Sequence, residues 1–160
     1  MNINQFFIID NFLDEPELHL QDIFDHNFTD VPSDVDTFKN IQDRQSDIVS
    51  DAVLKLMPSH DVAYNFVRKS PLDQDEPTYI HSDEIMGDLT CLLYLSKSHP
   101  KDDGTTIYED DELTKTMEFR SKFNRMIIFD AKLFHSRNIL SNFGVNKSAR
   151  LIQVIFLKKK

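Results

Sequence analysis

The sequence predicts an α+β fold in which two N-terminal helices pack on an antiparallel β-sandwich. Helical patterns of apolar residues lie before Pro58, and β-prone segments rich in Val, Ile, Tyr, Phe and Thr follow it. Turn residues separate these segments at a spacing typical of sandwiches and barrels. The segments are 62–68, 78–82, 89–96, 105–108, 115–119, 125–130, 133–139 and 149–157. We expect one domain over residues 1–160, helical over about 1–58 and β-structured over about 60–158.

The N-terminal part opens with a short β-prone run at residues 6–9. Asp14 then precedes Glu15-Pro16-Glu17, a pattern typical of a helix start. It combines a capping residue, a proline in the first turn and acids favoured by the helix dipole. The apolar stripe of this first helix is Leu20, Ile23, Phe24 and Phe28.

A second helix is expected to begin at Ser46 and to end before Pro58. Its apolar residues are Ile48, Val49, Ala52, Val53, Leu56 and Met57. The sequence between the two helices, residues 29–45, is polar and contains the helix breaker Pro32. We expect this stretch to be irregular.

Composition excludes several classes of function. The formal net charge of -9 argues against a nucleic-acid partner, because binding phosphates requires clustered Lys and Arg. The sequence has three glycines, none in a phosphate-binding loop pattern. Cys91 is the single cysteine, which excludes an intramolecular disulfide and fits a reducing compartment. Without a leader or a long apolar run, the chain is expected to be cytoplasmic, with no membrane partner.

His81, Asp83 and His135 are a candidate metal site. Positions i and i+2 of a strand lie on the same face, so His81 and Asp83 can chelate one ion at the end of the segment 78–82. His135 follows the apolar run 126–129 and can approach the pair from a separate strand. Two imidazoles and one carboxylate form the set that holds Fe(II) on one face and leaves open coordination positions.

Each of these residues also has a plainer structural interpretation. With this composition, roughly one His-x-Asp is expected by chance, and such a pair can lie at a surface turn. His135 can be a half-buried sheet histidine whose ring is satisfied by a hydroxyl or backbone group. We interpret the remaining histidines, which are His19, His26, His60 and His99, as structural.

Arg150 begins the last β-prone segment. An arginine at the start of an apolar strand is costly to bury unless it meets an anion. Its planar guanidinium pairs with a carboxylate through two parallel hydrogen bonds. The alternative is an edge-strand arginine that pairs with a surface acid.

Five segments resemble, in order, the Fe(II)/2-oxoglutarate-dependent oxygenase superfamily, and specifically its prolyl 4-hydroxylase-like branch in its bacterial or phage-type form. They are Tyr79–Asp83, Leu89–Ser96, Asp103–Tyr108, Phe123–Phe129 leading to His135, and Ser148–Leu151. The resemblance is continuous from about residue 78 to 157. It implies a double-stranded β-helix (jelly-roll) core with the N-terminal helices packed on one sheet.

The resemblance also implies roles for single residues. His81, Asp83 and His135 would be the catalytic iron ligands, and Arg150 would hold the distal carboxylate of 2-oxoglutarate. Tyr94 would place its hydroxyl on that same carboxylate, unless it is a sheet aromatic with its hydroxyl at the surface. Fe(II), 2-oxoglutarate and O2 are the implied cofactor and co-substrates.

The implied reaction is hydroxylation of a prolyl residue, another amino acid or a small molecule, with release of succinate and CO2. Asp83 stands where a halogenase would have Gly or Ala, which favours hydroxylation. Phe156 stands where the nucleic-acid-dealkylating branch has a second arginine. The expected partner is therefore a small-molecule or protein substrate, while the oligomeric state is not indicated.

The chain departs from the family pattern at Asp103, where a glycine is usual, and it is short beyond Arg150. Residues 70–77 form an acidic loop beside the predicted site, which we interpret as solvated rather than as a gate. Two other hypotheses remain open. One is a non-catalytic jelly-roll binding module that retains a metal site, and the other is a cupin. Cupins gather ligands as His-x-His, which His81-x-Asp83 does not match.

Overall fold

The computed structural model describes residues 6–109, 113–139 and 141–160. Its elements are β1 (Phe7–Ile9), α1 (Pro16–Phe24), β2 (Thr29–Pro32), β3 (Thr37–Asp43), α2 (Ile48–Leu56), β4 (His60–Ser70), β5 (Leu89–Tyr94), β6 (Gly104–Tyr108), β7 (Lys115–Arg120), β8 (Arg125–Asp130), β9 (His135–Arg137), the 3-10 turn η2 (Asn146–Ser148) and β10 (Arg150–Lys159). No helix among the described residues is long and apolar enough to cross a membrane.

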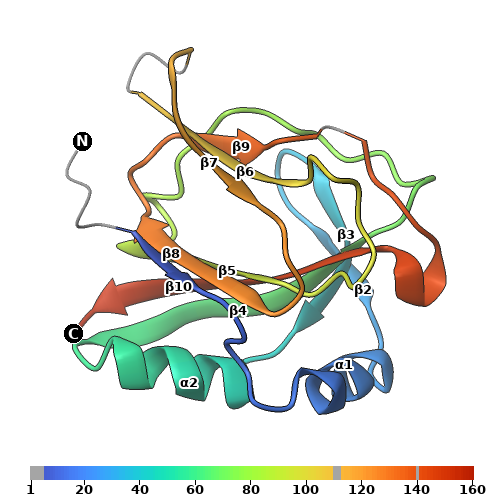
Figure 1. Ribbon diagram of the computed structural model, residues 1–160, viewed down its shortest axis with the longest axis horizontal. Coiled ribbons are helices and arrows are strands. Elements are labelled where there is room, and N and C mark those ends of the chain that lie inside the picture. Colours follow the sequence, from blue (N-terminus) through green and yellow to red (C-terminus); the bar gives the residue numbers. More distant parts are fainter. Residues whose placement is uncertain (1–5, 110–112, 140) are drawn as a thin grey trace.

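The strands form two antiparallel sheets. The large sheet has seven strands in the order β1-β8-β5-β10-β4-β3-β2, and the small sheet has three in the order β7-β6-β9. Figure 1 shows α1 and α2 on one face of the large sheet and the small sheet over its other face. This arrangement confirms the predicted α+β fold with a jelly-roll core and with the helices packed on one sheet.

The central strands of the large sheet are buried on both faces, and their alternate residues face two different cores. The core beneath the helices takes Cys91, Leu93, Met126 and Ile128. The core between the sheets takes Leu92, Tyr94, Ile127 and Phe129. Because both faces are covered, these strands appear in the sequence as continuous apolar runs.

Both helices begin later than the sequence predicted, α1 at Pro16 and α2 at Ile48, two residues after Ser46. Glu15, not Asp14, occupies the N-cap position of α1 and makes no side-chain cap, and Pro16 starts the helix. The N-cap of α2 is Asp47, and its carboxylate accepts hydrogen bonds from backbone N–H groups of the first turn. The negative charge of Asp47 is favoured at the positive end of the helix dipole, which Ser46 cannot match.

The secondary structure predicted from the sequence was wrong for two segments. Residues 29–45 are not irregular but contain the hairpin β2–β3 at the sheet edge, where Pro32 ends β2 and its missing N–H is tolerated. The predicted strand at 78–82 does not form, since only His81 pairs there, in an isolated bridge to His135. Residues 71–88 are instead an irregular segment that reaches across to the small sheet.

Candidate metal centre

His81, Asp83 and His135 come together, and one ligand atom from each lies within 4.8 Å of the others. His135 begins β9, while the other two belong to the irregular segment before β5. The backbones of the two histidines pair directly: His81 N–H donates to His135 O at 3.0 Å, and His135 N–H donates to His81 O at 2.8 Å. This bridge places the two imidazole rings 4.4 Å apart between centroids.

Asp83 is held from two sides. Its backbone N–H donates to the Ala131 carbonyl at 2.8 Å. The hydroxyl of Thr90, a fully buried residue of β5, donates to Asp83 Oδ2 at 2.9 Å. Sequence reasoning did not identify Thr90, because its contact with Asp83 depends on how the loop folds back on the sheet.

Hydrogen bonds to the backbone orient both imidazole rings. His81 Nδ1 lies 3.0 Å from the Tyr79 carbonyl, and His135 Nδ1 lies 2.9 Å from the Leu133 carbonyl. Since a carbonyl only accepts, each Nδ1 carries the proton and each Nε2 keeps its lone pair. The Nε2 atoms lie 3.4 Å from Asp83 Oδ1 and 3.2 Å from Oδ2 respectively. Acceptor atoms therefore converge on one point, which requires a cation among them.

The electrostatics of the site agree with this geometry. Burial would raise the pKa of Asp83, but the hydrogen bonds from His135 and His81 outweigh it and hold that pKa well below its usual range. Burial would lower the pKa of His81, yet the contact with Asp83 outweighs it and raises that pKa. Both directions favour a positive charge beside the Asp83 carboxylate, which a divalent metal ion would supply.

Arg150 and Tyr94 also lie inside the sandwich. Arg150 is 5% exposed, and its Nε is buried with no hydrogen-bond partner among the described residues. That atom lies 3.6 Å from Asp103 Oδ1. Tyr94 is 2% exposed rather than at the surface, its hydroxyl lies 2.6 Å from Thr105 Oγ1, and burial raises its pKa.

Further charged residues that the sequence did not single out lie next to Arg150. Glu76 Oε1 accepts a hydrogen bond from Arg68 Nη1 at 3.0 Å, and Arg137 Nη1 is 3.9 Å from the same oxygen. The Glu76 side chain is 7% exposed, so the loop 70–77 is not simply solvated as predicted. Burial, together with the charge of Arg150, lowers the pKa of Arg137 to about 10. The i+2 spacing from His135 was the signal that points to Arg137.

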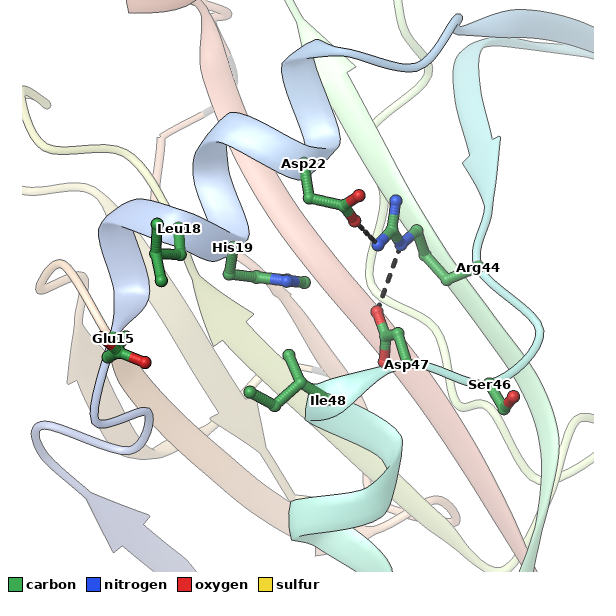
Figure 2. A pocket seen from close by; sticks show the side chains of 8 residues that line it. All are labelled: Glu15, Leu18, His19, Asp22, Arg44, Ser46, Asp47 and Ile48. Atoms are coloured by element: carbon green, nitrogen blue, oxygen red, sulfur yellow. Dashed lines mark hydrogen bonds and ion pairs between the residues drawn. The ribbon is translucent and has the colours of Figure 1, made fainter.

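A separate hollow of about 420 Å³ lies on the helix side of the large sheet (Figure 2). It is lined by Glu15, Leu18, His19, Asp22, Arg44, Ser46, Asp47 and Ile48. Arg44 forms ion pairs with both Asp22 and Asp47, as the dashed lines in Figure 2 show. No member of the His–Asp–His group lines this hollow.

The structure is similar to those of several Fe/2-oxoglutarate-dependent oxygenases. The epimerase SnoN in complex with Fe3+, α-ketoglutarate and nogalamycin RO has a TM-score of 0.63 at 13% identity, over 96% of this chain and 78% of SnoN. EctD from S. alaskensis, with 2-oxoglutarate and 5-hydroxyectoine, has a TM-score of 0.63 at 13% identity, over 94% and 71%. The viral collagen prolyl hydroxylase vCPH from Paramecium Bursaria Chlorella virus-1 has a TM-score of 0.62 at 15% identity, over 96% and 88%.

At these identities the likeness establishes a shared fold, the one that the five sequence segments implied. No protein-family model matches the sequence, and no curated protein matches it either.

Proposed function

We propose that this chain is an Fe(II)- and 2-oxoglutarate-dependent dioxygenase, with residues 1–160 as one oxygenase domain. The observation that carries this proposal is the orientation of the three donors. Two imidazole Nε2 lone pairs and a carboxylate converge on one point, and backbone carbonyls fix both ring tautomers. Nitrogen and oxygen donors in this ratio suit Fe(II) and leave coordination positions open for further ligands.

His81, Asp83 and His135 would hold the metal through Nε2, a carboxylate oxygen and Nε2. Thr90 keeps one Asp83 oxygen occupied by a hydrogen bond and so fixes the carboxylate orientation, as outer partners of metal ligands do. Bound Fe(II) would supply the activation of dioxygen that couples oxidative decarboxylation of 2-oxoglutarate to oxidation of the substrate. Succinate and CO2 would then leave.

Arg150 and Tyr94 would anchor the distal carboxylate of 2-oxoglutarate. A buried guanidinium with an unpaired N–H is costly unless an anion completes its hydrogen bonds. The hydroxyl pair of Tyr94 and Thr105 offers a further donor beside it. The protein thus contributes metal ligands and a cationic anchor for the carboxylate of 2-oxoglutarate, while the oxidation itself belongs to the cofactor.

For the primary substrate we propose a prolyl residue, another amino acid or a small molecule, with hydroxylation as the reaction. The related structures include a collagen prolyl hydroxylase and a protein bound to 5-hydroxyectoine, so both peptides and small molecules suit the fold. The net charge of -9 argues against nucleic acid. Asp83 fills the coordination position that a halide would need.

The test is succinate formation from 2-oxoglutarate by the Fe(II)-loaded protein, measured with the wild type, His135→Ala and His99→Ala. His99 is a partly exposed histidine outside the site and serves as the matched control. We expect succinate from the wild type and from His99→Ala, and none above background from His135→Ala. Equal succinate from all three proteins would contradict the proposal.

A non-catalytic binding module would behave differently in the same experiment. It would take up iron through the same three residues but form no succinate with any substrate offered. The cupin hypothesis has no support from the sequence around His81, because the residues at i-2 and i+2 are Tyr79 and Asp83 rather than histidine.

A further inference from the structure

Five charged side chains gather beside the metal donors, and their charges do not balance. They are Arg68, Glu76, Asp103, Arg137 and Arg150. Glu76 Oε1 is 3.0 Å from Arg68 and 3.9 Å from Arg137, and Asp103 Oδ1 is 3.6 Å from Arg150. The three guanidinium groups carry three positive charges and the two carboxylates carry two negative charges. One positive charge is therefore not neutralised within the cluster.

The hydrogen bonds of this cluster are also incomplete. Three donors of the cluster, the Nε atoms of Arg68, Arg137 and Arg150, and one acceptor, Asp103 Oδ1, are buried with no hydrogen-bond partner within the part of the chain that the structure describes. Unpaired donors therefore outnumber unpaired acceptors. Folded proteins pair nearly all of their buried polar groups, because an unpaired one carries its full desolvation cost. Unused donors together with an unbalanced positive charge indicate that an anion binds here.

Arg137 is the arginine whose charge is least compensated. Within 4.0 Å, the described residues offer it one carboxylate oxygen, Glu76 Oε1, which is already hydrogen-bonded to Arg68. Its other hydrogen bonds go to neutral groups, the Asn142 side-chain carbonyl and the Ser141 backbone carbonyl. These bonds orient the guanidinium without neutralising it.

The position of Arg137 connects the metal donors with the Arg150 anchor. His135 and Arg137 are two residues apart on β9, so their side chains leave the same face of the strand. That face points into the sandwich, since His135 packs edge-on against Phe129 of the large sheet. Arg137 also pairs in register with Thr105, whose hydroxyl contacts Tyr94.

From this arrangement we propose that Arg137 and Arg150 form a two-armed clamp on the distal carboxylate of 2-oxoglutarate, with Arg137 as a specificity-determining residue. The inference rests on the proposed function. A single carboxylate between the two guanidiniums would balance the charges of the cluster and supply acceptors for the unused donors. Arg150 alone would bind a carboxylate weakly, because Asp103 already compensates much of its charge. Arg137 supplies the additional positive charge.

The test compares two ligands that differ only at the distal end, 2-oxoglutarate and 2-oxovalerate, which has a methyl group in place of the distal carboxylate. Their affinities for the anaerobic Fe(II)-loaded protein are measured by calorimetry. The proteins are the wild type, Arg137→Gln, Arg137→Lys, Arg150→Gln and Arg120→Gln. Arg120 is an exposed arginine of β7 and is the matched control.

We expect Arg137→Gln to weaken 2-oxoglutarate binding by about tenfold or more, the value of a charge-assisted hydrogen bond, while 2-oxovalerate binding changes by less than about threefold. Arg137→Lys should fall between Arg137→Gln and the wild type, because it keeps the charge but loses the planar fork. Arg120→Gln should match the wild type with both ligands.

Two other outcomes separate the clamp from the proposed function. If Arg150→Gln loses the preference for 2-oxoglutarate while Arg137→Gln keeps it in full, the clamp is wrong and the proposed function stands. If the wild type binds neither ligand, the proposed function itself fails. Arg137 also donates a hydrogen bond to Asn142, which in turn donates to the Gln74 carbonyl in the loop 70–77. Thermal melting and iron uptake of Arg137→Gln check that a loss of affinity does not come from disruption of this loop.

Discussion

The two faces of the seven-stranded sheet each bury a polar network, and the two networks differ in how far they satisfy themselves. On the helix side, His19 Nε2 lies 2.7 Å from Gln153 Oε1, and Gln153 Nε2 donates to Asp47 and to Asn65 at 2.8 Å each. Asp47 also accepts a hydrogen bond from Arg44, so these side chains satisfy one another's hydrogen-bonding groups. This network joins α1, α2, β4 and β10 and needs no external group.

On the opposite face, the same kinds of side chain leave their bonding incomplete. Three arginine Nε atoms are buried without a partner among the described residues, and the two histidines direct lone pairs at a carboxylate. Burial of polar groups alone therefore does not identify a site in this protein. The site differs from the helix-side network because its polar groups are not satisfied by one another. The donor atoms of the His–Asp–His group lack a cation, and the arginines lack an anion.

The largest effect is expected when one donor of the His81–Asp83–His135 group is removed. Wild-type protein should gain about 2.7 kcal/mol of stability at a metal concentration 100 times the dissociation constant. Asp83→Ala should show no such gain, because one of three ligands and the charge of the site are lost. Thermal melting with and without Ni(II) measures the effect, and Glu84→Ala, an exposed neighbouring acid, should behave like the wild type.

The matching change on the helix side should damage stability instead of metal binding. Asp47→Ala removes the α2 cap and the carboxylate that Arg44, Asn65 and Gln153 use. We expect a loss of about 3 kcal/mol in the free energy of unfolding, since α2 loses its cap, Arg44 loses one of its two carboxylate partners, and the buried donors of Asn65 and Gln153 lose an acceptor. Urea denaturation measures this, with exposed Asp51→Ala costing less than about 1 kcal/mol. An unchanged stability would show that the network is not structural.

A smaller effect separates the orientation of Asp83 from its presence. Thr90→Val keeps the side-chain shape but removes the hydrogen bond to Asp83. Metal affinity should fall by about tenfold, the low end of the range for outer partners of metal ligands. Calorimetric titration with Ni(II) measures it, and Thr116→Val on the exposed side of β7 is the control. Unaltered affinity in Thr90→Val would mean that Thr90 does not orient the ligand.

The smallest expected effect concerns pH and belongs to the helix side. Burial lowers the pKa of His19, although its bond to Gln153 opposes this. Because the unfolded chain binds the proton more readily, the stability contributed by neutral His19 is present above its unfolded pKa of about 6.5 and is lost as pH falls below it. His19→Gln should therefore lose less stability than the wild type between pH 7.5 and 5 in urea denaturation. An identical pH dependence in the two proteins would show that His19 does not contribute to the loss of stability at low pH.

The sequence was most informative where local spacing carries the chemistry. The apolar runs at 89–96 and 125–130 predicted the central strands, because their two faces are both covered. His81-x-Asp83 and the later His135 predicted the three donors that come together, since their side-chain types are visible in sequence. The strand expected to place His81 and Asp83 on one face does not form, and the irregular segment brings them together instead.

Other features were not predictable because they depend on tertiary neighbours. The hairpin β2–β3 lies at an exposed edge and therefore lacks an apolar pattern. Residues 78–82 have β-prone side chains, yet pairing there is limited to His81, since context overrides propensity. The sequence did not identify Thr90, Glu76 and Arg68 as site residues, because only the folded chain brings them next to the predicted residues.

We propose above that Fe(II) and 2-oxoglutarate bind together at the site formed by His81, Asp83, His135 and Arg150. Anaerobic titration of 2-oxoglutarate into the Fe(II)-loaded protein, followed by visible absorption, tests it without knowledge of the substrate. We expect a saturable metal-to-ligand charge-transfer band that is absent in Asp83→Ala and requires more 2-oxoglutarate in Arg150→Gln. A wild-type protein that binds iron but develops no band at saturating 2-oxoglutarate would contradict it.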